Sequence, residues 1–111
     1  MPAAFNPISR IDPPQVSLNA ATAIGPGSVI VFSGPQTTVS MQVTFTGAPA
    51  TLTVVMEGSL DGVNFTTLGT ATNPTNNAIV TSTTTEALYA RANMTVLTGG
   101  TSPTVTARIM P

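Results

Sequence analysis

The chain has 111 residues, the usual size of one domain, and only 6% of them are charged, with a formal net charge of −1. This balance argues against electrostatic binding to nucleic acid or to an acidic membrane surface. The sequence contains no histidine and no cysteine, which removes the commonest general base and the thiolate metal ligands. No apolar run of about 18 residues is present that could cross a membrane, and no secretory signal is visible.

Threonine, alanine and valine take the place of charged residues, and the mean hydropathy is positive, at +0.32. A chain of this composition is poorly protected against association with other chains. One interpretation is a stable β-domain whose outer faces are covered by hydroxyl groups. The interpretation that we favour is that neighbouring subunits of an assembly cover much of the surface.

Residues 1–15 contain four prolines and are expected to form an extended N-terminal arm. Proline fixes the backbone φ angle and donates no hydrogen bond, so it suits neither a helix nor a central strand. The segment could be a disordered tail, as many termini are. Its apolar side chains Phe5, Ile8 and Ile11 favour an arm that binds a partner, followed by a β-sandwich domain over residues 16–111.

Alternation of apolar and polar residues predicts strands along the rest of the chain. It is clearest in residues 37–46, where valine, methionine and phenylalanine share one face and hydroxyl and amide side chains share the other. The segments expected as strands are 16–20, 29–32, 37–46, 52–57, 65–68, 78–82, 87–97 and 103–110. No helical period is present, so the pattern predicts an all-β protein, an antiparallel β-sandwich or jelly roll of about eight strands.

Glycine, proline and asparagine separate these strands. Residues 23–28 are expected as a turn, and residues 33–35 are expected to end the second strand. Residues 47–50 have the length of a hairpin turn, residues 69–78 are expected as a loop, and residues 98–102 as the last turn.

The last two strands raise a question about charge. If they pair directly across the turn at Gly99 and Gly100, Arg108 lies close to Asn93 and diagonal to Arg91 on the outer face. Two guanidinium groups would then repel one another unless an acid approached them. Glu57 and Glu86 are the candidate acids, although an ordinary solvated or ion-paired face is the simpler expectation.

Residues 51–68, TLTVVMEGSLDGVNFTTL, give the strongest local signal, a strand, a turn and a second short strand. Glu57 and Asp61 are the only close acidic pair near a turn, and two carboxylates can perform acid–base chemistry or help to bind Ca²⁺. No nucleophile–base pair can be assembled, since Ser59 has no histidine or lysine to activate it. We therefore expect no enzyme, no catalytic residue, no metal site and no cofactor.

The expected role of Asp61, Gly62 and Asn64 is to form the turn of this hairpin. Aspartate and asparagine side chains hydrogen-bond to their own backbone in turns, and glycine supplies a positive φ. These three residues are therefore predicted to mark the fold rather than to form a reactive site.

The stretch from Met56 to Leu68 resembles the "EGSLDG-x-N-aromatic" hairpin of small virion proteins of tailed bacteriophages. The likeness continues in Tyr89-Ala90-Arg91-Ala92-Asn93 and in the Gly99-Gly100 turn before the last strand, so that it covers roughly residues 39–109. The turn is also similar to the "S-x-DG-x-x-W" hairpin of discoidin-type carbohydrate- or lipid-binding sandwiches. In that family a tryptophan usually stands where this chain has Phe65, and no ligand-binding aromatic loop is evident here.

The virion resemblance implies a structural protein, and with the composition it favours a capsid decoration (cement) protein on the outer surface of a phage head. Its expected partners are the major capsid protein or other virion subunits, together with copies of itself, a trimer being favoured. It would be made in the cytoplasm of the bacterial host. The alternatives are another head or tail component (head fibre base, tail tube or tail tip) and a discoidin-like carbohydrate-binding module.

Overall fold

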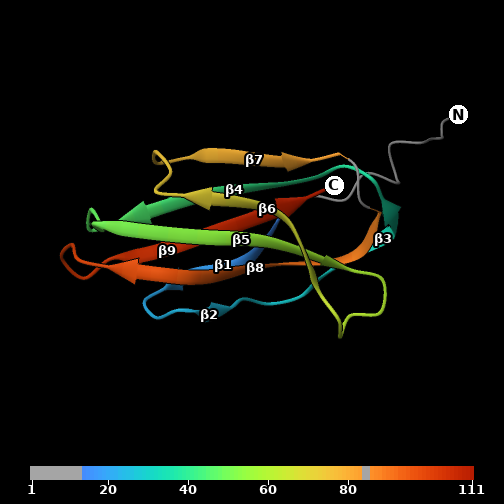
Figure 1. Ribbon diagram of the computed structural model, residues 1–111, viewed down its shortest axis with the longest axis horizontal. Coiled ribbons are helices and arrows are strands. Elements are labelled where there is room, and N and C mark those ends of the chain that lie inside the picture. Colours follow the sequence, from blue (N-terminus) through green and yellow to red (C-terminus); the bar gives the residue numbers. More distant parts are fainter. Residues whose placement is uncertain (1–13, 84–85) are drawn as a thin grey trace, which may run out of the picture.

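The alternating segments form two antiparallel sheets that pack face to face (Figure 1). The computed structural model describes residues 14–83 and 86–111. Within these ranges no helix is long and apolar enough to cross a membrane. The strands of the described residues are β1 (Gln15–Ala21), β2 (Gly25–Pro26), β3 (Ile30–Gln36), β4 (Val39–Thr46), β5 (Thr51–Ser59), β6 (Thr66–Thr72), β7 (Ala78–Ser82), β8 (Ala87–Thr98) and β9 (Thr104–Met110).

Sheet A contains the strands in the order β1-β9-β4-β7, and sheet B contains them in the order β2-β8-β5-β6. Strand β3 also pairs with β8 in sheet B. Every strand pair is antiparallel. The expected all-β antiparallel sandwich is therefore confirmed, with one short strand more than the eight that the sequence predicts. Residues 1–13 lie outside the described residues, so the structure does not report on Phe5, Ile8 and Ile11.

The core lies between the sheets and is built from the residues that the period of two places inward. In the middle of sheet A the inward side chains come from β4 and β9, and in sheet B they come from β5 and β8, as the alternation predicts. The largest fully buried side chains are Met41, Met56, Met94, Ile109, Val39, Val43, Val54 and Val105. Phe32 is also buried in this core, and the methionines adapt their shape to the gaps between the two sheets.

The largest differences from the expected strands concern β2, β3 and β6. Residues 25–26 pair with β8 inside the segment expected to be a turn, and β3 continues to Gln36 through residues 33–35. Strand β6 reaches Thr72, so the loop expected over residues 69–78 is wrong for its first four positions. The inward positions of that part of β6 are Gly69 and Ala71, which are too small to give an apolar period that sequence analysis can detect.

Two turns, the one of hairpin length and the one between the last two strands, carry the chain from one sheet to the other. The β4–β5 turn, at residues 47–50, and the β8–β9 turn, at residues 99–103, each join a strand of sheet A to a strand of sheet B. They pack side by side, since the backbone N–H of Thr101 donates to the carbonyl oxygen of Gly47 at 2.8 Å and that of Ala50 donates to Thr98 at 2.8 Å. The direct pairing of the last two strands that was considered from the sequence therefore does not occur.

Ser17 ties the two sheets together along one side of the sandwich. It lies in β1 of sheet A and is buried. Its hydroxyl donates to the carbonyl oxygen of Ser28 at 2.7 Å and accepts from the backbone N–H of Ala92, in β8 of sheet B, at 2.8 Å. The Ser17 carbonyl oxygen accepts from the N–H of Ser28 at 2.7 Å, and the N–H of Gly27 donates to Ala92 at 2.7 Å. We call this set of contacts the Ser17 clasp.

Candidate interaction surfaces

The outer face of sheet A is covered mainly by short polar side chains. Those of β4 and β9 point outward in matched rows, Thr46 beside Thr104 and Thr44 beside Thr106. The hydroxyls of Thr46 and Thr104 lie 2.7 Å apart, those of Ser40 and Thr81 lie 3.0 Å apart, and Thr44 reaches the Thr106 carbonyl oxygen at 3.4 Å. Because these hydroxyls already have partners within the protein, covering them with another apolar or polar surface leaves few groups unsatisfied.

Arg108 is the one charged side chain that the described strands place on this face. It lies on β9 between Val16 of β1 and Gln42 of β4, and it is exposed. Among the described residues it has no ion-pair partner. Because β9 belongs to the opposite sheet from β8, Arg108 does not lie beside Arg91, and the repulsion considered from the sequence does not arise.

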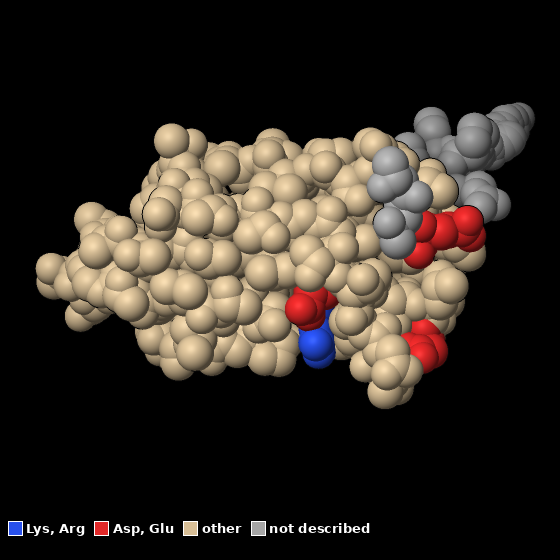
Figure 2. Space-filling view, viewed as in Figure 1, with Lys and Arg blue, Asp and Glu red and all other residues tan. Residues whose placement is uncertain are grey.

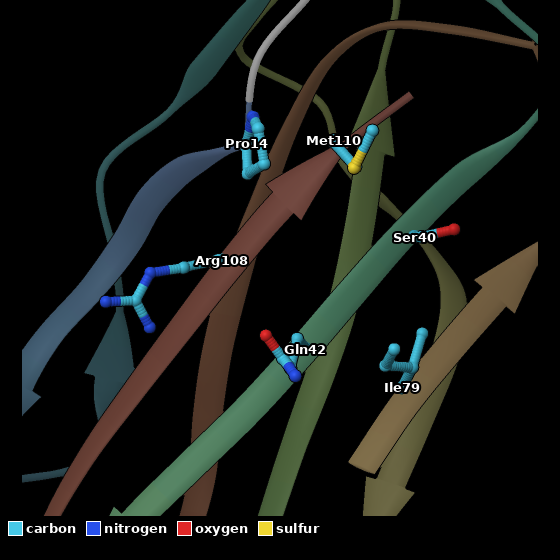
Figure 3. A pocket seen from close by; sticks show the side chains of 6 residues that line it. All are labelled: Pro14, Ser40, Gln42, Ile79, Arg108 and Met110. Atoms are coloured by element: carbon cyan, nitrogen blue, oxygen red, sulfur yellow. The ribbon is translucent and has the colours of Figure 1, made fainter. Parts of the chain in front are cut away.

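A shallow hollow lies next to Arg108, near the end of sheet A at which β1 begins and β9 ends. Figure 3 shows the six side chains that line it, which are Pro14, Ser40, Gln42, Ile79, Arg108 and Met110. Its volume of about 160 Å³ is below the roughly 300–1,000 Å³ of typical small-molecule pockets. The hollow therefore suits one or two protein side chains better than a metabolite, and within the described residues no group of acids or other ligating side chains could hold a metal ion.

The outer face of sheet B carries an internally neutralised charge pair. The Nε of Arg91 donates to Glu57 at 2.7 Å, and the side-chain amide of Asn93 donates to the other Glu57 oxygen at 3.3 Å. The Arg91 guanidinium also lies over the ring of Phe65, 4.1 Å from its centroid. Of the two acids considered for Arg91, Glu57 is thus its partner, and Figure 2 shows basic and acidic atoms side by side on this face.

This arrangement bears on both roles considered for these residues. The Glu57 carboxylate accepts from Arg91 and Asn93, whereas the Asp61 carboxylate accepts from groups of its own turn. One face of the Phe65 ring is covered by Arg91, so that face is not open to stack on a sugar. Nothing in this geometry supports transfer of the discoidin-type carbohydrate site.

Asp61 organises the β5–β6 turn through its carboxylate. The Oδ1 atom accepts from the backbone N–H groups of Val63 and Asn64 and from the Ser59 hydroxyl, each at 2.8 Å. The Oδ2 atom accepts from the Asn64 side-chain amide at 2.8 Å. The Ser59 oxygen in turn accepts from the N–H groups of Asp61 and Gly62, at 3.1 and 2.9 Å. This set of hydrogen bonds therefore holds the turn in one conformation.

These hydrogen bonds favour the charged form of the carboxyl group. The backbone N–H groups of Asn64 and Val63, followed by the side chains of Asn64 and Ser59, hold the pKa of Asp61 well below its usual value. A lowered pKa in the folded state contributes stability above the unfolded pKa of about 3.9, and this stability is lost as the pH falls toward the folded pKa.

We therefore expect Asp61→Asn to be less stable than the parent protein at neutral pH and to approach it as the solution is acidified. Asparagine keeps one acceptor oxygen but opposes its own amide to that of Asn64. Urea unfolding midpoints measured between pH 7 and pH 2 check this, with Leu60→Ser, a neighbour without a titratable group, as the control. Parallel pH profiles for the parent and Asp61→Asn would contradict the role of the carboxylate.

The same turn presents two large apolar side chains to solvent. Gly62 takes a positive φ of 77°, and a side chain added there would touch the ring of Tyr89, so the turn lies against sheet B. Leu60 is 64% exposed and Val63 is 78% exposed. Figure 1 shows the turn projecting at one end of the sandwich. We call Leu60, Asp61 and Val63 the apolar knob. Leu60 and Val63 supply its exposed apolar side chains, and Asp61 holds the backbone between them.

Sequence analysis places Asp61, Gly62 and Asn64 together in one turn, and the structure finds them there. The exposure of Leu60, Val63 and Ile79 was not predicted. The exposure of Ile79 could have been predicted once its partner strand was known. Ile79 of β7 pairs with Gln42 of β4, and the alternation placed Gln42 on the outer face. For Leu60 and Val63 no periodic signal exists, because they lie in an irregular turn.

Comparison with known proteins gives a match in structure. No protein-family model and no curated protein matches the chain. The crystal structure of the SPBc2 prophage-derived protein YomS is similar, with a TM-score of 0.59 over 89% of this chain and 92% of that chain, at 13% sequence identity. At this level of identity the similarity shows the fold, and it is evidence for the sandwich that is independent of the alternation in the sequence.

Proposed function

We propose that the protein is a structural component of a bacteriophage particle, and more narrowly a decoration protein that binds the outer surface of the head and stabilises it. The observation that carries this proposal is the outer face of sheet A, where threonine hydroxyls are paired across neighbouring strands. The resemblance of the hairpin at residues 56–68 to phage virion proteins agrees with it. So does the similar fold of a prophage-derived protein.

In this proposal the protein stabilises the head by burying the outer face of sheet A against a shell subunit. Removing a polar surface from water is costly when its groups lose hydrogen bonds, but paired hydroxyls keep theirs. The half of sheet A nearest the β4–β5 turn, which contains Thr44, Thr46, Thr104 and Thr106, can therefore lie against a shell subunit without needing complementary charge. Each contact is weak, and many copies on one lattice add avidity. In this proposal Phe5, Ile8 and Ile11 extend the contact beyond the sandwich.

The test compares the two faces of the sandwich. A lysine at Thr44, on sheet A, is expected to release the protein from purified particles, because it adds an unpaired charge to the buried contact. The matched variant Thr70→Lys adds the same charge to the outer face of sheet B and should still bind. Sedimentation of particles with each variant gives the bound fraction, and release by Thr70→Lys alone would place the contact on the other sheet.

Electron microscopy of particles made without the protein tests the role itself. We expect density to disappear from the head surface and the particles to lose heat resistance. Unchanged head density together with unchanged heat resistance would reject the decoration role. Density missing from the tail instead would redirect the proposal to a tail component.

A further inference from the structure

We propose that copies of this protein bind one another by inserting the apolar knob of one copy, formed by Leu60, Asp61 and Val63, into the hollow beside Arg108 on the next. The two surfaces are complementary in shape, since one projects and the other is hollow, and they carry opposite charges. One is a projecting turn with two exposed apolar side chains, and the other is a small hollow with apolar walls. This contact is separate from the proposed shell contact, which uses the threonine half of sheet A.

The hollow has the properties of a receptor for side chains. Pro14, Ile79 and Met110 supply its apolar wall, and Ile79 is 64% exposed although it is an isoleucine on an edge strand. Ser40, Gln42 and Arg108 complete the lining, so apolar side chains are rimmed by polar ones, an arrangement typical of surfaces that bind a protein partner. In Figure 3 the six side chains come from β4, β7 and β9 and from the residue just before β1, so the base of the hollow is a rigid sheet.

The knob has the properties of a ligand for that hollow. Its backbone is held by the hydrogen bonds of Asp61 and Ser59, so little conformational freedom would be lost on binding. Val63 and Leu60 are among the most exposed large apolar side chains of the described residues. Burying both would remove apolar area from water, and the Asp61 carboxylate would keep its hydrogen bonds within the turn.

Charge complementarity points to a second copy as the occupant. Among the described residues, Arg108 has no ion-pair partner, and no basic residue occurs in residues 59–65 to neutralise Asp61. The nearby cation of sheet B, Arg91, is already paired with Glu57. Figure 2 shows acidic atoms on the projecting lobe that the β5–β6 turn forms, without basic atoms beside them. Docking the knob in the hollow brings opposite charges together at the rim.

Within one molecule the two surfaces belong to different sheets of the sandwich. The hollow lies on the outer face of sheet A, whereas the knob belongs to sheet B, and two packed sheets are separated by about 10 Å of core. The contact is therefore between copies and joins different patches, which gives a ring when the rotation closes and a chain when it does not.

The test is directed cross-linking, which is clean because the chain has no cysteine. Purified full-length Val63→Cys and isotope-labelled Ile79→Cys are mixed at high concentration and treated with a short bismaleimide. We expect a cross-linked pair containing one labelled and one unlabelled chain, identified by mass spectrometry. The matched control is Ile24→Cys in place of Ile79→Cys, since Ile24 is 61% exposed but lies near β2 of sheet B. Equal yields for the two pairs would overturn the proposal.

A charge variant tests the rim of the hollow. Arg108→Glu is expected to lower the cross-linking yield by roughly two- to fivefold at low salt, the range that an exposed ion pair allows, while Arg108→Lys retains it. Cross-links between two Val63→Cys chains alone would overturn the proposal in favour of a symmetric contact. Protection of Ile79→Cys from maleimide in dilute, monomeric protein would overturn it by showing that the chain's own residues 1–13 fill the hollow. Because no particles are present, these results are separate from the test of the shell contact.

Discussion

Replacing Gly27 by alanine is expected to destabilise the protein by roughly 3 kcal/mol or more, because the new methyl group has no space. An ideal Cβ at this position would lie 2.2 Å from the carbonyl oxygen of Ser17 and 2.6 Å from its carbonyl carbon. Both are backbone atoms of the Ser17 clasp and cannot move aside as a side-chain tip would. The clasp would have to open, which would break the hydrogen bonds that join β1 to Ser28 and Ala92.

Urea unfolding of Gly27→Ala measures the loss, and Gly34→Ala provides the matched control. A Cβ added at Gly34 would meet no atom within 4 Å, and its φ is outside the left-handed region. Alanine there should be neutral or slightly stabilising, because it restricts the unfolded chain. Equal unfolding free energies for the two variants would show that the clasp does not hold the sheets together.

The Ser17 clasp also illustrates what the sequence does not reveal. Ser17 lies in a segment recognised as a strand, but its bonds reach Ser28 and Ala92, which are 11 and 75 positions away. A serine that joins two sheets has the same local pattern as one that faces solvent. Only the packing of β1 against Ser28, which precedes β3, and against the middle of β8 distinguishes the two.

The strand faces could be predicted because burial imposes a period of two. Val39, Met41 and Val43 are fully buried, and so are Val105 and Ile109, all as the alternation indicated. The pairing of strands was harder, because turns of similar length can return a chain within a sheet or pass it to the opposite sheet. The turns after β4 and β8 pass the chain to the opposite sheet. Arg108 therefore lies on sheet A, away from Arg91, and is the one charged residue of the described strands of that sheet.

Of the candidate surfaces, one could be predicted from the sequence and the other could not. The Asp61 turn was predictable because its chemistry is local: every hydrogen bond of its carboxylate is made to a residue within three positions. The hollow was not, since Pro14, Gln42, Ile79 and Arg108 come from distant parts of the chain. Local polar chemistry can be inferred from sequence, whereas a surface that several strands build together requires their order in the sheet.

Replacing Met56 by alanine is expected to lower the free energy of unfolding by about 2–5 kcal/mol, a large share of the 5–15 kcal/mol that stabilises a typical domain. Met56 is fully buried at the centre of β5, with Gly69 of β6 and Ala92 of β8 beside it. These neighbours are too small to fill the space that its side chain leaves. The substitution therefore removes apolar contacts and opens a cavity between the sheets.

The measurement is urea unfolding of Met56→Ala, Met56→Leu and Met110→Ala. Leucine keeps most of the volume and should cost less than about 1.5 kcal/mol. Met110→Ala removes the same atoms from the half-buried rim of the hollow, where the lost side chain was partly in water, so its cost should be well below that of Met56→Ala. Equal losses at positions 56 and 110 would mean that the methionines between the sheets are not the main apolar support of the fold.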